Sequence, residues 1–217
     1  MGGMDATVTV TAVDEVGPNT YAIRFGTPDG FSAEPGQFVK LGTEIDGELV
    51  SRFYTLSSPT VTDTFEVTVG IDPEEGGEFS AFLGEIESGV EMELAGPHGD
   101  SHYDGEGRVV VLAGGPGVGP AVAIAERAIE EGGEAAVVYR DDDPAHGTRL
   151  GALRERGATV YLLGDDTDLS APVMDVLTGA DGEGVFVYGF ADFIADAEAA
   201  IEAAAGDVDA AKIENFG

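Results

Sequence analysis

The sequence predicts two domains of different class: a six-stranded antiparallel β-barrel over residues 1–104, then a doubly wound parallel α/β sheet over residues 105–217. Two observations carry this prediction. Short strand-like segments separated by turn residues fill residues 8–94, which favours a small closed barrel. Beyond the glycine-rich stretch 104–107, apolar runs alternate with helical patterns, which favours a parallel sheet with helices on both faces.

Six segments rich in β-branched and aromatic residues are the predicted barrel strands. They cover residues 8–13, 20–25, 37–41, 49–56, 65–69 and 90–94. Turn signals such as Gly17-Pro18-Asn19 and Pro28-Asp29-Gly30 separate them. One helix is expected at 79–86, directly after Gly76-Gly77, so a helical segment interrupts the barrel before its last strand.

The second domain opens on Val109-Val110-Val111-Leu112, a continuous apolar run typical of a parallel strand buried on both faces. A helix is expected to follow it, from about Val118 to Glu131. The remaining strands are expected at 135–139, 159–163, 185–188 and 211–213, and the remaining helices at 149–156, 171–177 and 193–204.

The chain is very acidic, with 42 acidic and 10 basic residues and a formal net charge of −32. The acids are scattered through the whole sequence, which predicts a surface adapted to concentrated salt, as in a halophilic archaeon, where screening removes the repulsion. A cationic partner is the less favoured alternative. The scarcity of lysine and arginine argues against binding to a nucleic-acid backbone.

Several site classes are disfavoured by composition. The sequence contains no cysteine, which rules out disulfides and cysteine-held iron–sulfur clusters. The three histidines are dispersed, and no metal site is expected. No apolar run reaches the roughly 18–20 residues of a membrane span, and the start MGGMDATVTV lacks the features of a signal peptide. A cytoplasmic protein is therefore expected.

The stretch Arg52-Phe53-Tyr54-Thr55-Leu56-Ser57-Ser58 gathers a cation, two aromatic rings and three aliphatic hydroxyls at the end of a predicted strand. Side chains alternate in an extended segment, so Arg52 and Tyr54 should face one way and Phe53 and Thr55 the other. We expect Phe53 and Leu56 to contact the core. The polar and aromatic side chains could hold a flat, anionic ligand.

A second candidate segment is the glycine-rich run 113–120, AGGPGVGP, which follows a predicted parallel strand and opens a helix. Glycines allow close backbone approach, and a helix N-terminus offers N–H groups to a pyrophosphate. The run is not a G-x-G-x-x-G fingerprint, because Pro120 replaces the third glycine. A second ligand edge is expected at Tyr188-Gly189-Phe190, where another parallel strand ends.

Five segments in order resemble motifs of the ferredoxin–NADP reductase family. The stretch 52–58 resembles the family's R-x-Y-[ST] flavin motif, and the run 113–120 resembles its A-G-G-x-G-[IV]-x-P nucleotide loop. Three further matches stand at Pro35-Gly36-Gln37-Phe38, Gly77-Glu78-Phe79-Ser80 and Gly96-Pro97-His98-Gly99. The resemblance covers nearly the whole chain, in the same order of barrel and sheet.

The resemblance implies an FAD-dependent NAD(P)H oxidoreductase that passes a hydride between nicotinamide and flavin, and electrons to or from a separate acceptor such as ferredoxin. Domain 1–104 would bind FAD and domain 105–217 would bind NAD(H) or NADP(H). Arg52 would pair with the FAD pyrophosphate, Tyr54 would pack on the flavin, and Thr55 would hydrogen-bond near its hydride-accepting nitrogen.

The resemblance also implies a set of site residues. The catalytic residues it implies are Thr55, Tyr188, Glu214 and Phe216. The cofactor-binding residues it implies are Arg52, Phe53, Tyr54, Thr55, Ser57, Val69, Gly70, Ile71, Gly76, Gly77, Glu78, Phe79, Ser80, Gly114, Gly115, Gly117, Tyr139, Arg140, Gly189 and Phe190.

The sequence departs from the family pattern near residue 188. Tyr188-Gly189-Phe190 stands where the family often has Cys-Gly-Pro, so a cysteine contact with the nicotinamide is absent or altered. The ending Glu214-Asn215-Phe216-Gly217 is similar to the E-x-aromatic ending in part of the family, and a frayed tail is the alternative. Arg140 and Arg149 could hold a 2′-phosphate, but Asp141-Asp142-Asp143 would repel it, which favours NADH.

Two alternative functions stay open. Within the same class, the chain could be an NAD(P)H:flavin reductase or an electron-transfer subunit of a larger complex. In a different class, it could be a non-catalytic nucleotide-binding or regulatory module that kept the fold, and the residues at 188 and 190 favour this alternative. Such a module would bind a nucleotide without reducing a flavin.

Overall fold

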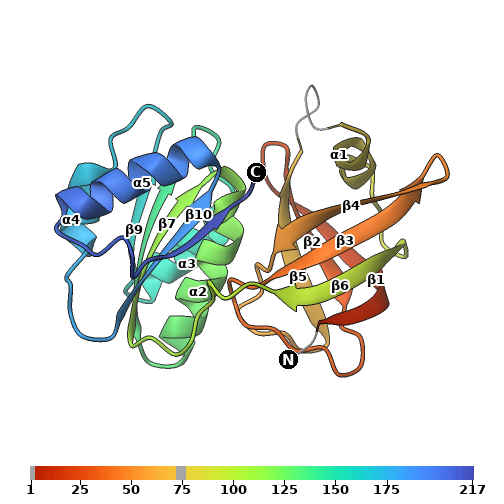
Figure 1. Cartoon of the computed structure of the whole chain (residues 1–217), viewed down its shortest axis with the longest axis horizontal. Coiled ribbons are helices and arrows are strands. Elements are labelled where there is room, and N and C mark those ends of the chain that lie inside the picture. Colours follow the sequence, from red (N-terminus) through yellow and green to blue (C-terminus); the bar gives the residue numbers. More distant parts are fainter. Residues whose placement is uncertain (1–2, 72–76) are drawn as a thin grey trace.

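The structure is a computed structural model of the chain, and it describes residues 3–71 and 77–217. Two sheets lie side by side in it, one antiparallel and one parallel with helices packed on it (Figure 1). The predicted fold class is confirmed. Within the described residues, no helix is long and apolar enough to cross a membrane.

The first sheet contains six antiparallel strands in the order β4-β3-β6-β1-β2-β5. Their bounds are β1 Met4–Gly17, β2 Thr20–Gly26, β3 Phe38–Ile45, β4 Glu48–Thr55, β5 Thr64–Gly70 and β6 Glu91–His98. The first part of β1 pairs with β6 and the second part with β2, with a register shift after Val10. A bulge of this kind bends a strand, which curls the sheet around its apolar face.

The sheet is less closed than a complete barrel. Strands β4 and β5 lie at its two ends, and among the described residues they meet at the bridge between Leu56 and Val67. Beside this bridge, the Ser57 N–H donates to the Glu66 carbonyl at 2.8 Å. Leu56 is fully buried there, as expected. The helix α1 (Gly77–Gly84) packs at the open side of the sheet through Phe79 and Leu83.

The expectation that Phe53 contacts the core is wrong, because its side chain is 61% exposed. Phe53 lies on the outer face of the edge strand β4, where its ring packs against Phe38 and His98 at centroid distances of 5.5 and 6.3 Å. The next residue, Tyr54, packs against the apolar cluster instead. Alternation therefore holds in β4, but the inward face is the one that carries Tyr54.

The second sheet is parallel, with strand order β11-β10-β7-β8-β9. Its strands are β7 Arg108–Gly114, β8 Glu134–Arg140, β9 Thr159–Leu163, β10 Glu183–Gly189 and β11 Lys212–Asn215. Its helices are α2 Val118–Glu130, α3 Gly147–Glu155, α4 Ser170–Val176 and α5 Ala191–Ala203. Helices α2 and α3 cover the face toward the first domain, and α4 and α5 cover the opposite face (Figure 1). This confirms the doubly wound arrangement.

The central strand β7 explains why this domain has a continuous apolar signal. Val109, Val110, Val111 and Leu112 are all fully buried, because helices cover both faces of the strand. The carboxyl ends of β7, β8 and β10 therefore meet at one edge of the sheet, as in other parallel sheets. The predicted domain boundary after residue 104 falls in the segment between β6 and β7.

Candidate functional site

The end of β4 presents a cation and an aromatic ring on the same side. Arg52 is exposed, its Nη1 donates to the Ser51 carbonyl at 2.8 Å, and it forms no ion pair with another described residue. Tyr54 stacks on Phe79 of α1, with ring centroids 6.4 Å apart and planes 23° apart. Burial raises the pKa of Tyr54, so its hydroxyl is neutral at pH 7. An open guanidinium and a planar ring thus flank one edge of the barrel.

The start of α1 lies next to this edge. Gly77 has a positive φ of 69°, and a Cβ added there would meet no atom within 4 Å. Ser80 Oγ is buried and has no hydrogen-bond partner among the described residues. Glu78 is exposed in the first turn. Of the predicted site, Gly76 lies outside the described residues.

The remaining predicted flavin residues are more enclosed. Thr55 is 8% exposed and Ser57 is fully buried. The Ser57 hydroxyl donates to Glu66 Oε1 at 3.0 Å, so it is engaged inside the first domain. The end of β5 brings three further residues near α1, with Val69 in the core, Gly70 exposed and Ile71 packed against Gly84.

The glycine-rich loop lies at the carboxyl end of β7, as predicted. Gly115–Gly117 form one turn of 3₁₀ helix that leads directly into α2. A Cβ on Gly117 would lie 2.2 Å from the Tyr188 carbonyl oxygen, so only glycine fits there. A Cβ on Gly114 would lie 2.5 Å from the Phe193 ring. Gly115, by contrast, faces open space with φ at 54°, which leaves its backbone accessible.

The end of β10 lies beside this loop and meets the C-terminus. Gly189 packs against Phe193, and its carbonyl accepts the Phe216 N–H at 3.0 Å. Phe216 meets Phe190 edge-on at 6.1 Å, and the Phe190 side chain is 52% exposed. The tail before Phe216 is therefore paired rather than frayed, because β11 runs parallel to β10 at the edge of the sheet. The C-terminus lies near the junction of the two domains (Figure 1).

Two predicted catalytic residues are partly or fully enclosed at this junction. Glu214 is paired with Tyr188 across the two strands, and burial raises the pKa of its carboxyl. Tyr188 is fully buried, and its hydroxyl donates to the Ser101 carbonyl at 2.6 Å. A Cβ on Gly36 would lie 2.4 Å from that hydroxyl. Tyr188 thus joins the second sheet to the first domain.

The cations near the end of β8 are all engaged. Arg140 pairs with Asp196 at 2.9 Å and lies 5.1 Å above the Phe193 ring. Arg149 pairs with Glu126 at 2.6 Å and with Glu66 at 3.1 Å, so it lies at the domain interface rather than in the nucleotide site.

Tyr139 at the end of β8 is 1% exposed, which leaves little of it for a ligand. Its hydroxyl donates to Asp141 Oδ2 at 3.0 Å and accepts the Ala145 N–H at 3.1 Å. Burial raises the pKa of Asp141. Tyr139 therefore shapes the turn that follows β8.

Sequence reasoning missed the residues that join the domains. His146 is 4% exposed, and its Nε2 lies 2.8 Å from Thr68 Oγ1 of β5. Gly119 of α2 approaches the same threonine, since an added Cβ would lie 2.7 Å from it. No pattern in the sequence marks these pairs, because 78 residues separate His146 from Thr68.

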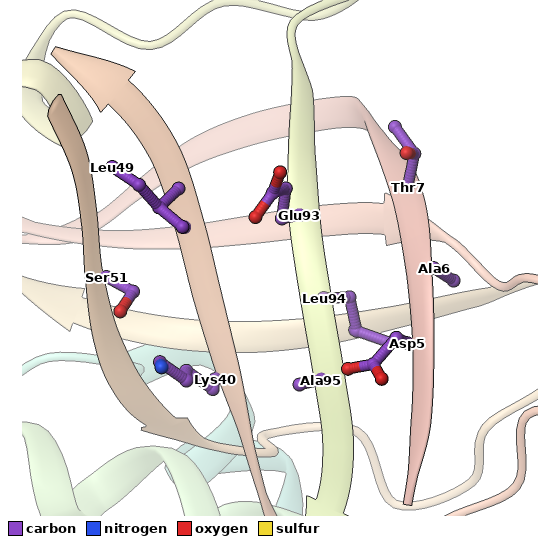
Figure 2. A pocket seen from close by; sticks show the side chains of 10 residues that line it. Asp5, Ala6, Thr7, Lys40, Leu49, Ser51, Glu93, Leu94 and Ala95 are labelled. Atoms are coloured by element: carbon purple, nitrogen blue, oxygen red, sulfur yellow. The ribbon is translucent and has the colours of Figure 1, made fainter. Parts of the chain in front are cut away.

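A hollow of about 400 Å³ lies elsewhere in the described structure. Figure 2 shows it on the outer face of β1, β6, β3 and β4, where Asp5, Lys40, Ser51 and Glu93 point into it. None of the predicted site residues is among the described residues that line this hollow, although Ser51 directly precedes Arg52. The predicted site residues lie instead at the ends of β4 and β5 and the start of α1 in the first domain, and at the ends of β7, β8 and β10 and near the C-terminus in the second.

Comparison with known proteins identifies the first domain. Residues 7–103 match the model of the oxidoreductase FAD-binding domain. The chain is 40% identical over 110 residues to the glycine betaine monooxygenase reductase subunit of Chromohalobacter salexigens, covering 48% of this chain and 29% of that protein. It is 32% identical over 109 residues to NADH-cytochrome b5 reductase 1 of Eremothecium gossypii, covering 47% and 37%. The chain thus spans less than half the length of these relatives.

Solved structures share the fold over nearly the whole chain. The FAD/NAD-binding domain of nitric oxide dioxygenase from Vibrio cholerae has a TM-score of 0.85 at 18% identity, covering 97% of this chain and 98% of that one. The Amycolatopsis cytochrome P450 reductase has a TM-score of 0.83 at 23% identity, covering 99% and 70%. A ferredoxin NADP⁺ reductase from Neisseria gonorrhoeae has a TM-score of 0.77 at 17% identity, covering 98% and 99%.

Proposed function

Because residues 7–103 form an oxidoreductase FAD-binding domain and the whole chain adopts the fold of ferredoxin–NADP reductases, we propose that this protein is an FAD-dependent NAD(P)H oxidoreductase. It passes electrons to a separate acceptor, which we propose is a ferredoxin. The observation that carries the proposal is the edge formed by β4 and α1. There Arg52 has no ion pair and the buried Ser80 Oγ has no hydrogen-bond partner among the described residues. Tyr54 lies two residues after Arg52 and stacks on Phe79, the residue before Ser80.

The residues at this edge fit FAD. Arg52 would hold the pyrophosphate through its planar donors, and the first turn of α1 near Gly77 and Ser80 would add N–H and hydroxyl donors. Tyr54 would offer its ring to the flavin, and Thr55 a hydroxyl at the strand end. When bound there, FAD supplies the chemistry of accepting a hydride and releasing single electrons.

The glycine loop fits a nicotinamide nucleotide. Gly114, Gly115 and Gly117 place backbone N–H groups at the carboxyl end of β7, where parallel sheets bind ligands. Gly189 and Phe190 form the neighbouring edge. We propose NADH as the donor, because Arg140 and Arg149 are already paired with carboxylates and a 2′-phosphate would have to compete with them.

A separate acceptor is supported by the names of related proteins. The Chromohalobacter salexigens relative is a monooxygenase reductase subunit, which implies that its electrons leave for another component. The present sequence has no cysteine to hold an iron–sulfur cluster. Electrons must therefore leave this chain for another protein or a small molecule.

The proposal is tested by the visible spectrum of the protein purified in molar salt, followed by anaerobic addition of NADH and then NADPH. We expect a flavin spectrum that NADH bleaches. A colourless protein that FAD cannot reconstitute would refute the flavoenzyme and leave a nucleotide-binding module. Bleaching by NADPH alone would refute the assignment of the donor.

The net charge of −32 supports a further part of the proposal, that the protein works in concentrated salt. Repulsion among exposed carboxylates is screened within about 3 Å at 1 M salt. We expect the thermal unfolding midpoint to rise by about 10 °C or more between 0.1 and 3 M KCl, which is roughly 2.5–5 kcal/mol for a chain of this size. A midpoint that is independent of KCl would contradict it.

A further inference from the structure

Arg149 of α3 donates to three residues, of which Glu126 lies in its own domain and Glu66 and Ser57 lie across the domain interface. Its Nη2 donates to Glu126 Oε2 at 2.6 Å and to the Ser57 carbonyl at 2.8 Å, and its Nη1 donates to Glu66 Oε1 at 3.1 Å. Glu126 belongs to the helix that the glycine loop opens. Ser57 follows Thr55 by two residues in the predicted flavin stretch. One guanidinium thus touches an element of each predicted site.

Glu66 completes this contact on the side of the first domain. Its carboxylate accepts the Ser57 hydroxyl, and its backbone N–H donates to Ser58 Oγ at 2.7 Å. The side chains of Glu66 and Arg149 are 17% and 23% exposed. Burial raises the pKa of Glu66, and the charge of Arg149 opposes that rise. The pair is therefore shielded from salt better than an exposed pair, and it should persist in a concentrated electrolyte.

A second contact lies on the neighbouring part of β5. Thr68 Oγ1 lies within hydrogen-bond distance of the His146 ring, and the backbone N–H of His146 donates to the Val16 carbonyl at 2.8 Å. The backbone of Gly119 lies against Thr68 and Ser57, since an added Cβ would lie 2.7 and 3.3 Å from their side chains. Gly119 follows Gly117 of the nucleotide loop by two residues. The end of the flavin stretch and the start of α2 are therefore in direct contact.

We propose that Arg149 and His146 are positioning residues that hold the flavin stretch and the nucleotide loop at a fixed separation. The inference rests on the proposed function, because it is the meeting of nicotinamide and flavin that requires this spacing. Reacting atoms must approach to about 3–3.5 Å, and a misplacement of about 1 Å can cost roughly 100-fold in rate. Arg149 is suited to the task because its planar fork meets Glu126, Glu66 and Ser57 at once.

The experiment compares Arg149→Gln with Arg154→Gln in the full chain loaded with FAD. Arg154 lies on the same helix but donates only to the Val160 carbonyl of its own domain, among the described contacts. We expect the rate of flavin reduction at saturating NADH to fall about 10- to 100-fold in the first variant. The dissociation constants of FAD and NADH should stay within about threefold, since Arg149 contacts neither predicted phosphate site. Arg149→Lys should recover part of the rate.

A second measurement needs no turnover. Amide hydrogen exchange of residues 55–58 and 117–120 should accelerate about tenfold or more in Arg149→Gln and stay unchanged in Arg154→Gln. His146→Asn, which tolerates the positive φ of 55° at this position, should accelerate the exchange of 117–120 alone. If Arg149→Gln does not fold, the double variant Glu66→Gln/Arg149→Gln removes one of the two carboxylates that lose Arg149, the other being Glu126.

The outcomes separate the two proposals. Accelerated exchange together with slower reduction supports the positioning role. Accelerated exchange with a normal rate overturns it and leaves a purely structural contact, and unchanged exchange overturns it as well. If NADH does not bleach the wild-type protein, the proposed function fails instead, and exchange then shows only whether Arg149 holds the two segments together.

Discussion

The two predicted phosphate sites of this chain are built differently. On the flavin side, Arg52 has no ion pair and Ser80 Oγ has no hydrogen-bond partner among the described residues. On the nucleotide side, Arg140 is paired with a carboxylate, and the loop offers backbone groups. In a chain with 10 basic and 42 acidic residues, an unpaired cation is scarce. The flavin site therefore relies on a side-chain charge, and the nucleotide site relies on backbone geometry.

The largest effect on activity should come from a substitution in the glycine loop, which would bind the nucleotide through backbone groups. Gly117→Ala would place a methyl group 2.2 Å from the Tyr188 carbonyl, which belongs to a buried strand and cannot move cheaply. We expect NADH-dependent flavin bleaching to slow by about 100-fold or more, with FAD retained, as measured by anaerobic stopped flow. The control is Gly115→Ala, where the methyl group meets open space and the positive φ costs only about 1–2 kcal/mol. Equal loss in both variants would contradict the packing argument.

FAD binding at the flavin site should weaken in the variant Arg52→Ala. Loss of a charge-assisted pair with the pyrophosphate should weaken FAD binding about 10- to 100-fold, as measured by titration of the apoprotein with FAD. The unfolding midpoint of the apoprotein should not change, because Arg52 is exposed and forms no ion pair with the residues that the structure describes. Arg154→Ala is the matched control. A variant that stays fully loaded with flavin would show that Arg52 does not hold the pyrophosphate.

The contact between the two sites should depend on pH through His146. Burial, with a smaller contribution from Arg149, lowers the pKa of His146 from 6.5 to about 3. The unfolded chain therefore binds the proton first, and stability falls as pH drops from about 6.5 toward 3, by up to about 1.4 kcal/mol per pH unit. Burial raises the pKa of Glu66 and Glu214, which acts in the opposite direction.

Comparing the wild-type protein with His146→Asn isolates the contribution of His146 to the pH dependence of stability. We expect denaturant unfolding between pH 4 and 7 to show a shallower loss of stability in the variant. Parallel curves for the two proteins would show that His146 is not held neutral at the interface.

The smallest effect concerns the choice of nucleotide. Asp196→Asn would release Arg140 from its carboxylate, which is 58% exposed and easily replaced by water. We expect the preference for NADH over NADPH to shrink by up to about fivefold, since an exposed charge contact contributes about 0.2–1 kcal/mol. The measurement is the ratio of kcat/KM for the two nucleotides in molar salt. An unchanged ratio would show that Arg140 does not reach the 2′ position.

Most of the secondary structure could be predicted from local patterns. The strand at 159–163 has the predicted bounds, and α2 ends one residue before the prediction. Strand β1 is longer than expected, because its two parts pair with different neighbours and a bulge lets it bend. The face of Phe53 was predicted wrongly, because alternation defines two faces of a strand without stating which one is buried.

The candidate site was predictable as separate segments. Each glycine run and the stretch Arg52–Ser58 occupy a strand end or a helix start, which local patterns reveal. The role of Ser57 inside the first domain and the enclosure of Tyr139 and Tyr188 were not predictable. Their hydroxyl groups meet partners that other segments supply.

The sequence by itself determined the class of each domain, the order of strands and helices along the chain, and the placement of glycines where backbone must approach backbone. These are local properties, set by side-chain period and by the φ angles that each residue allows. Only the tertiary structure decided which cations stay unpaired and how the two sites are joined. Arg149, Glu66 and Ser57 are far apart in sequence, and their contact exists because α3 packs against β5 across the domain interface.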